Sequence, residues 1–246
     1  MKRALLTGGS NGLGRALADL LLQRGYQVVS VDRSGGAAQP AMLHVTCDLA
    51  DRHAVDRTLP AILAAGPYEL AIFNAGASAT GRFEDIPLDA CLRLLAVNAE
   101  TPLVFATALM QAGAVERHLC FISSLSHFTG YPGAAVYAAS KDVVAAYAKG
   151  VRKPFAAHGV SVTLACPGPI RTAQAERHAP PGADAARRMP PEQAARAILD
   201  ATLGHRRLVI PGAGPKLFAL AGWLFPAFVT RQMKRLIFDR LDEAVW

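Results

Sequence analysis

The chain has 246 residues, 52% of them hydrophobic and 18% charged, which excludes a disordered protein and suits one large α/β domain over 1–246. Its net charge is +7, but the basic residues are scattered, with short pairs such as Arg187-Arg188, so we expect no nucleic-acid groove. The four cysteines are far apart and form no CxxC motif, which argues against a metal site or disulfide framework and favours a reducing, cytoplasmic location.

The chain opens with a short apolar run from Lys2 to Thr7, which predicts a buried strand. This run is too short for a signal peptide. No segment reaches the roughly 20 apolar residues of a membrane span. The nearest is Leu217 to Val229, and Pro226 interrupts it.

A glycine-rich turn follows this strand and precedes an amphipathic helix that ends at Gly25. Glycines let a backbone approach a pyrophosphate, and the helix N-terminus offers amide donors and partial positive charge. A tight turn without a ligand is the alternative, but its place after the first strand favours phosphate binding. The residues expected to bind cofactor here are Gly8, Ser10, Asn11, Gly12, Leu13 and Gly14.

The second predicted strand, Tyr26 to Val31, ends at Asp32 and Arg33. A carboxylate at this position accepts hydrogen bonds from the adenosine ribose and repels a 2′-phosphate, which predicts NAD. A guanidinium pairs with that phosphate, so Arg33 leaves NADP open.

The third predicted strand, Met42 to Thr46, is followed by Asp48 and Leu49. Both are candidate contacts to the cofactor adenine. Equally, Asp48 could simply cap the helix that starts near Asp51.

The fourth predicted strand runs from Glu69 to Phe73 and leads into Asn74-Ala75-Gly76. Small residues at a strand end beside the glycine turn leave room for a cofactor. A helix is then predicted from Pro87 to Thr101. It contains Asn98, which is either functional or a helix asparagine with local backbone hydrogen bonds.

The fifth predicted strand, His118 to Ser123, delivers Ser124 beside a helix that carries Tyr137 and Lys141. Residues four apart share a helix face, and an ammonium beside a phenol lowers the phenol pKa. Such a tyrosine exchanges protons with an alcohol or carbonyl near neutral pH. An exposed Tyr/Lys pair is the alternative.

A sixth strand is predicted from Val160 to Ala165, before a turn rich in proline and glycine. The residues of this turn complete a set of motifs through which the chain resembles the short-chain dehydrogenase/reductase family over roughly residues 2 to 210. The matching residues are Thr7, Gly8, Gly12, Gly14, Asn74, Ala75, Gly76, Asn98, Ser124, Tyr137, Lys141, Pro167, Gly168, Ile170 and Thr172.

The resemblance implies a doubly wound parallel sheet (a Rossmann fold) of about seven strands, a nicotinamide cofactor, and a homodimer or homotetramer. It implies that Tyr137 is the acid/base and that Lys141 lowers its pKa and binds the nicotinamide ribose. Ser124 would polarise the substrate oxygen, and Asn98 would support a water-linked proton path. The turn that would position the nicotinamide comprises Pro167, Gly168, Ile170 and Thr172.

The chain departs from the family pattern in two places. Phe73 stands where many members carry a further asparagine, and Ser126-His127 stands where a small residue and glycine are common. Because His127 is larger than the glycine common there, it puts the shape of the substrate pocket in question. We expect that pocket to be lined by Ser126, His127, Phe128 and Tyr131.

Residues 173–190 are polar and contain Pro and Gly, which fits either a substrate lid or a plain surface loop. A helix from Pro191 to Leu203 and a last strand from Arg206 to Ile210 follow. Residues 212–246 form a C-terminal extension, apolar and aromatic first, then basic. It fits a peripheral membrane contact through 215–246, a cover for an apolar substrate, or packing within the protein or between subunits.

These features together favour an NAD(P)-dependent oxidoreductase that interconverts a secondary alcohol and a ketone, with an apolar or lipid-like substrate. The alternative is a non-catalytic NAD(P) sensor or scaffold on the same fold. A sensor does not need the catalytic residues. A third hypothesis, a membrane-associated reductase of lipid carbonyls, differs from the first in the role of the tail.

Overall fold

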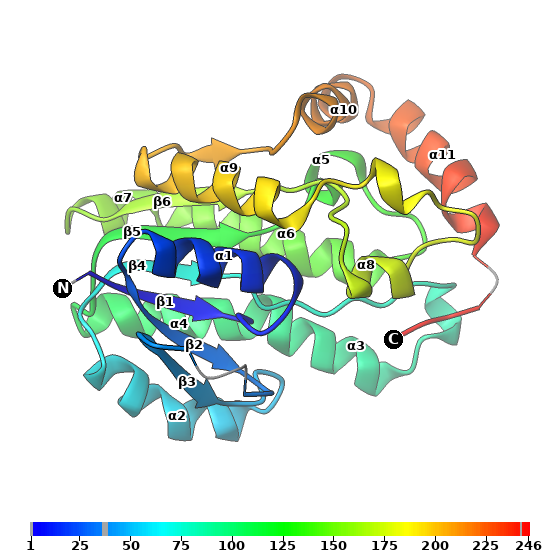
Figure 1. Ribbon diagram of the computed structural model, residues 1–246. Helices are drawn as coiled ribbons and strands as arrows, with labels where there is room; N and C mark the ends of the chain where they lie inside the picture. Colours follow the sequence, from blue (N-terminus) through cyan, green and yellow to red (C-terminus); the bar gives the residue numbers. More distant parts are fainter. Residues whose placement is uncertain (1, 36–38, 242) are drawn as a thin grey trace.

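A parallel sheet of seven strands forms the centre of the computed structural model, which describes residues 2–35, 39–241 and 243–246 (Figure 1). The strand order is β3-β2-β1-β4-β5-β6-β7, which confirms the predicted doubly wound Rossmann fold. The strands are β1 (Arg3–Thr7), β2 (Gln27–Asp32), β3 (Met42–Thr46), β4 (Tyr68–Phe73), β5 (Val115–Ile122), β6 (Ser161–Ala165) and β7 (Leu208–Val209).

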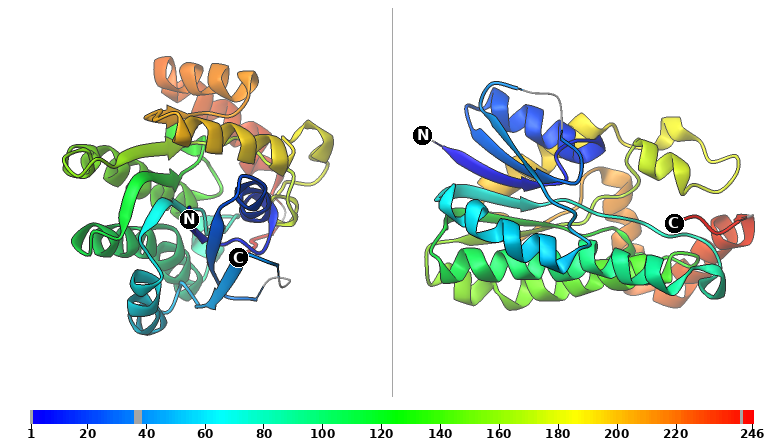
Figure 2. Two further views of the ribbon diagram at one scale, coloured as in Figure 1. Left: turned by 60° about the vertical axis from the view of Figure 1, so that its left-hand side comes forward. Right: turned by 90° about the horizontal axis from the view of Figure 1, so that it is seen from below.

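Helices cover both faces of the sheet (Figure 2). Helices α1 and α9 pack on one face, and α2, α4, α6 and α7 on the other. The α-helices are α1 (Gly12–Gln23), α2 (Arg52–Ala64), α3 (Leu88–Leu95), α4 (Thr101–Gln111), α5 (Ser126–Thr129), α6 (Ala135–Gly150), α7 (Arg152–Ala156), α8 (Ala173–Arg177), α9 (Pro191–Leu203), α10 (Ala213–Leu224) and α11 (Pro226–Leu236). The short turns are η1 (Phe83–Asp85), η2 (Ala96–Glu100), η3 (Ala185–Arg187) and η4 (Phe238–Arg240).

The strands read as continuous apolar runs because both faces of the sheet are buried. In β1, Ala4 and Leu6 face the layer of α1 and α9, while Leu5 between them faces the opposite layer. The sheet therefore separates the two main clusters of the core, and a smaller third cluster contains Ala79, Ile86 and Leu94.

The chain reverses its winding direction between β1 and β4, which are neighbours in the sheet. At such a switch point the loops after two adjacent strands diverge and leave a crevice at their carboxyl ends. The glycine-rich turn follows β1 at this edge, and Asn74 follows β4. The loop with Ser124 follows β5, so the topology gathers the predicted site along one edge of the sheet.

The helix expected to end at Thr101 continues to Gln111 through the π-helical turn η2. Pro102 has no amide to donate to the Asn98 carbonyl four residues earlier, which would break a regular α-helix. The Thr101 amide instead bonds the Ala96 carbonyl, one residue further back than in an α-helix. This irregular turn carries Asn98.

By length and composition alone, one helix among the described residues, Leu88–Gln111, is long and apolar enough to cross a membrane. Its second half, however, packs Phe105 and Leu109 completely buried in the protein core. It therefore has the position of a core helix of the domain.

Two strand boundaries also differ from the prediction. β7 contains just Leu208 and Val209, where Arg206 to Ile210 was expected, and β5 begins at Val115, before the expected His118. The predicted C-terminal extension forms the hairpin of α10 and α11, which packs against α5 outside the layers of sheet and helices (Figure 1). The last residues then return to the body, where Val245 pairs with Thr80.

Candidate active site

The turn after β1 holds its backbone tightly against the loop after β4. Gly8 has φ +71°, and a Cβ there would lie 2.8 Å from the Ala75 Cα. A Cβ on Gly14 would overlap the Gly8 carbonyl. Side chains are thus excluded from the turn, while the first amides of α1 remain at its surface with no acidic residue in the first helical turn. This arrangement fits the pyrophosphate of a dinucleotide.

Asn74 supports this turn directly. Its side-chain amide donates to the carbonyls of Thr7 and Gly8, at 3.2 and 3.0 Å. The Thr7 hydroxyl accepts from the amides of Asn74 and Ala75, at 3.0 and 3.1 Å. The Asn74 side chain, predicted as a cofactor contact, is therefore engaged in holding the turn.

Asp32 at the end of β2 lies against the same turn. Its carboxylate accepts from the Ser10 amide at 3.0 Å and from the Ser34 amide at 3.4 Å. Ser10 in turn donates its hydroxyl to the Ser34 carbonyl at 2.9 Å. A negative charge is thus fixed beside the glycine turn, while Arg33 is exposed.

Asp48 faces Arg93 on α3. Burial acts to raise its pKa, but the Ala50 amide and Arg93, 2.9 Å from the carboxylate, hold the pKa below its usual value. The helix α2 is capped by Asp51, which accepts from the His53 amide, so Asp48 is not its cap. Leu49 is buried, and its carbonyl accepts from the Thr101 hydroxyl.

The predicted catalytic residues come together between the end of β5 and the first turns of α6. The Ser124 hydroxyl lies close enough to the Tyr137 phenol to act on its pKa. The Lys141 ammonium lies 5.8 Å from the centre of the Tyr137 ring and donates to the Ile122 carbonyl at 3.0 Å. Lys141 is buried, with 4% of its surface exposed, so the pair is not the exposed Tyr/Lys alternative.

Asn98 reaches the same group of residues from η2. Its amide oxygen accepts from the Ala77 amide at 2.7 Å, and its nitrogen donates to the Ala77 carbonyl and to the Ser140 hydroxyl, both at 2.9 Å. A Cβ built on Gly76 would lie 3.3 Å from the Lys141 Nζ and 3.5 Å from the Asn98 Oδ1. Glycine at this position therefore keeps the space in front of Lys141 free for part of a cofactor.

The protonation of Tyr137 differs from the prediction. Burial raises its pKa, and the hydrogen bond from Ser124 opposes this rise. Burial also lowers the pKa of Lys141 to about 8. The expected lowering of the tyrosine pKa by the ammonium is thus wrong in this structure, because desolvation by burial is the largest influence and raises the pKa.

The turn after β6 contacts several other segments near the predicted catalytic residues. The Pro167 carbonyl accepts from the Leu125 amide at 2.9 Å and so fixes the loop after Ser124. Gly168 approaches Pro215 of α10, and Ile170 pairs with Met189. Thr172 caps α8 by accepting from the Ala175 amide at 3.1 Å.

Thr172 also lies close to the glycine turn, since a Cβ on Gly12 would be 3.0 Å from its methyl group. The predicted lid, 173–190, therefore begins beside the cofactor turn. It closes back on the strand end through Ile170 and Met189.

The four predicted pocket residues divide into two groups. Tyr131 packs its ring edge-on to Tyr137, with the ring centres 6.1 Å apart, and Ser126 is buried with a hydroxyl that has no hydrogen-bond partner among the described residues. His127 instead contacts Asp142 at 2.7 Å and Lys149 at 3.1 Å, on the exposed side of α6. These two partners hold the His127 ring beside α6, and its place in the pocket stays a prediction.

Phe128 packs its side chain against the hydrophobic core beside α6. Its carbonyl lies against Gly222 of α10. Of the four predicted pocket residues, Tyr131 is therefore the one whose ring packs on Tyr137.

Sequence reasoning missed three residues near the site. Ser140 bridges Asn98 and the Tyr137 carbonyl, and the Ser123 hydroxyl donates to the Lys141 carbonyl. Arg188 is 8% exposed in the lid and lies close enough to lower the pKa of Tyr131, which burial raises. Ser140 could have been found as a polar residue one turn after Tyr137, whereas nothing local marks Arg188 as buried.

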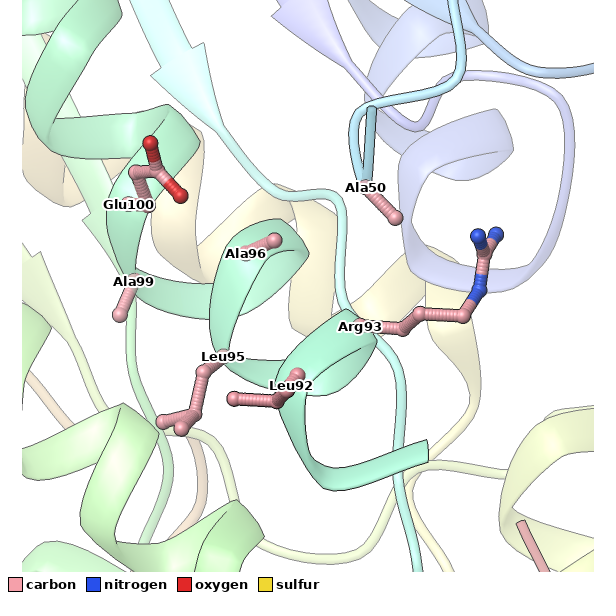
Figure 3. Close-up of a pocket in the computed structure, with 7 residues that line it drawn as sticks. All are labelled: Ala50, Leu92, Arg93, Leu95, Ala96, Ala99 and Glu100. Carbon is pink, nitrogen blue, oxygen red and sulfur yellow. The ribbon is translucent and has the colours of Figure 1, made fainter. Parts of the chain in front are cut away.

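A surface hollow of about 450 Å³ lies apart from the catalytic residues, between Ala50 and the segment of α3 and η2 (Figure 3). It is lined mainly by apolar side chains, with Arg93 and Glu100 at its rim. None of the predicted catalytic residues lines it, so this hollow is not the candidate active site.

The comparisons with known proteins agree with this fold. A family profile described as short chain dehydrogenase covers residues 2–181. The chain belongs to this family. It is similar to the 3-oxoacyl-acyl-carrier-protein reductase MabA of Mycobacterium tuberculosis, with 31% identity over 176 residues, 70% of each chain. The protein is accordingly an NAD(P)-dependent oxidoreductase with a short chain dehydrogenase fold.

Two solved structures illustrate the likeness. A short chain dehydrogenase from Burkholderia cenocepacia in complex with NADP has a TM-score of 0.75 and 26% identity, over 96% of this chain and 99% of its own. A 4-hydroxyisoleucine dehydrogenase complexed with NADH has a TM-score of 0.76 over 86% of this chain and 98% of its own. At 17% identity, the second shares the fold alone.

Proposed function

We propose that the protein interconverts a secondary alcohol and a ketone, with Tyr137 as the acid/base. The observation that carries this proposal is the position of Tyr137 between Ser124 on one side and the buried Lys141 on the other. A non-catalytic sensor needs the glycine turn but has no use for such an arrangement. When bound, the nicotinamide supplies or accepts the hydride.

The roles of the side chains follow from their positions. The Ser124 hydroxyl holds the substrate oxygen next to the Tyr137 phenol, which donates its proton during reduction and takes it back during oxidation. Lys141 would hydrogen-bond the nicotinamide ribose. Asn98 and Ser140 fix the segment in front of Lys141, where a water-linked proton path would end.

We propose NAD as the preferred cofactor. Gly8, Gly12 and Gly14 would hold the pyrophosphate, and Asp32 would accept from the adenosine ribose. The fixed carboxylate of Asp32, 3.0 Å from the Ser10 amide, would repel a 2′-phosphate. Arg33 is the residue that would accommodate NADP instead.

We propose an apolar substrate. Tyr131 beside Tyr137 and Pro215 beside Gly168 give the surroundings of the site an apolar character. The name of the mycobacterial relative, a reductase of 3-oxoacyl groups, agrees with a carbonyl on an acyl chain. We further propose a cytoplasmic homodimer or homotetramer, which light scattering of the purified protein tests.

The test is Tyr137→Phe, assayed with a panel of ketones of increasing chain length. We expect turnover to fall about 1,000-fold, within the range for loss of general acid/base catalysis, while cofactor binding persists. Tyr147→Phe is the matched control, since Tyr147 lies further along α6 and its hydroxyl contacts Thr107 of α4. Retained turnover in Tyr137→Phe would overturn the proposal.

A further inference from the structure

Helix α10 presents an apolar face to solvent. Its outward residues recur at helical spacing and are Lys216, Leu217, Leu220, Trp223 and Leu224. Trp223 is 72% exposed, and Phe225 and Phe228, at the turn into α11, are each 63% exposed. Side chains of this size rarely gather on the surface of a monomer unless they meet a partner.

Helix α11 continues the same surface with positive charge. Its exposed face carries Phe228, Arg231, Lys234 and Arg235. Residues 213–236 contain no aspartate or glutamate at all. Lys234 pairs with Asp239 at 2.8 Å, beyond the end of the helix. The hairpin thus combines an aromatic and aliphatic patch with adjoining cations.

The hairpin is attached to the body of the protein through the face opposite to its exposed side chains. The exposed face therefore does not pack on the core. Gly222 packs directly on the backbone of Phe128 and Thr129, where a Cβ would overlap the Phe128 carbonyl. Val229 is 2% exposed, and the Thr230 hydroxyl donates to the Thr129 carbonyl at 3.3 Å. One side of the hairpin is used for this attachment, while the side chains of its other side are exposed in the part of the chain that the structure describes. Figure 1 shows the two helices at the edge of the molecule.

The positive charge of the hairpin determines which kind of partner can bind its exposed face. A two-fold contact between two copies would bring the cations of one hairpin against those of the other, with no acidic residue in 213–236 to pair with them. Leucines and a tryptophan next to arginines match instead the boundary between acyl chains and anionic headgroups.

We propose that the α10–α11 hairpin docks the protein onto the surface of an anionic phospholipid membrane. Trp223, Phe225 and Phe228 enter the headgroup region, and Arg231 and Arg235 contact lipid phosphates. The hairpin packs on α5, which lies between Ser124 and Tyr131 in the chain, so docking places the membrane beside the candidate active site.

The test is sedimentation of the full chain with vesicles of phosphatidylcholine alone or with phosphatidylglycerol. We expect binding to the anionic vesicles, weakening as salt is raised. Trp223→Ser with Phe228→Ser should weaken it about 30-fold. Phe83→Ser with Leu88→Ser is the matched control, because these side chains are 76% and 72% exposed on another surface, and it should bind as the wild type does.

A charge variant gives a second, independent readout. Arg231→Gln with Arg235→Gln should weaken binding about 25-fold, at about fivefold for each cation near an anionic surface. Arg206→Gln with Arg207→Gln removes the same charge near β7 and should change binding little. Thermal unfolding of each variant shows whether the fold is retained.

Three outcomes would overturn the proposal. The first is absence of wild-type binding to anionic vesicles. The second is equal loss in the hairpin variants and their controls. The third is a hairpin that holds two copies together, seen as a smaller particle mass for Trp223→Ser with Phe228→Ser without any vesicle binding by the wild type.

Discussion

Replacing Lys141 with methionine should make the protein without cofactor more stable while destroying its activity. Methionine has a similar volume and length but no charge, so it fills the same space in the buried site. Lys141 is 4% exposed and its pKa is lowered from 10.5 to about 8, mainly by burial. The folded state therefore binds the lysine proton less tightly than the unfolded state does.

The size of the effect follows from this shift. At about 1.4 kcal/mol per pKa unit, the lowered pKa costs about 3 kcal/mol of stability at pH 7. Methionine removes this cost but loses the hydrogen bond to the Ile122 carbonyl, worth about 1 kcal/mol. The net gain of about 2 kcal/mol corresponds to about 4–8 °C in melting temperature for a domain of this size.

The pH dependence distinguishes this explanation from better packing. The cost is fully present below pH 8 and disappears as pH rises from about 8 towards 10.5, where lysine in the unfolded chain also loses its proton. The advantage of Lys141→Met should therefore fall by roughly 2 kcal/mol between pH 7 and pH 10.

Urea unfolding at both pH values measures the effect, with Lys153→Met, an exposed lysine on α7, as the control. A methionine variant that is no more stable than the wild type at pH 7, or an advantage that does not change with pH, would refute the reasoning.

Two further predictions concern the cofactor and the lid. Asp32→Ser removes the carboxylate at the end of β2 and should shift the ratio of NADPH to NADH affinity about tenfold towards NADPH in a fluorescence titration; an unchanged ratio would contradict the role given to Asp32. Deleting residues 243–246 removes the backbone bonds between Val245 and Thr80, at 2.8 and 2.7 Å, and the contact of Arg177 with the Trp246 carbonyl at 3.1 Å. Trypsin should then cut 173–190 faster while NADH affinity is unchanged, and equal cleavage rates would show that this contact does not hold the lid.

The sequence predicted the sheet and the meeting of the candidate catalytic residues because both depend on local patterns. Apolar runs define the strands, and Tyr137 and Lys141 share a face through helical spacing alone. The position of His127 was not predictable, since it depends on Asp142 and Lys149, which lie about two turns apart on α6. The pKa of Tyr137 likewise depends on burial by the whole fold, which spacing along a helix does not reveal.

Other features escaped prediction because they are contacts between distant parts of the chain. The return of Val245 to Thr80 joins residues that are 165 positions apart in the sequence (245 − 80). The continuation of the helix past Thr101 required the π-turn that accommodates Pro102, and sequence periodicity favours an end before that proline. The attachment of α10 through Gly222 is likewise a contact between residues that lie far apart in the sequence.

The central claim, that the chain transfers hydride to a carbonyl carbon with Tyr137 as proton donor, is tested most directly with NADH deuterated at the transferred position. We expect mass spectrometry of the alcohol formed from a long-chain ketone to find the deuterium on the carbinol carbon. We expect Tyr137→Phe to bind the cofactor but to form almost no labelled alcohol. Cofactor binding by the wild type without label in any alcohol of the ketone panel would contradict it and favour the sensor.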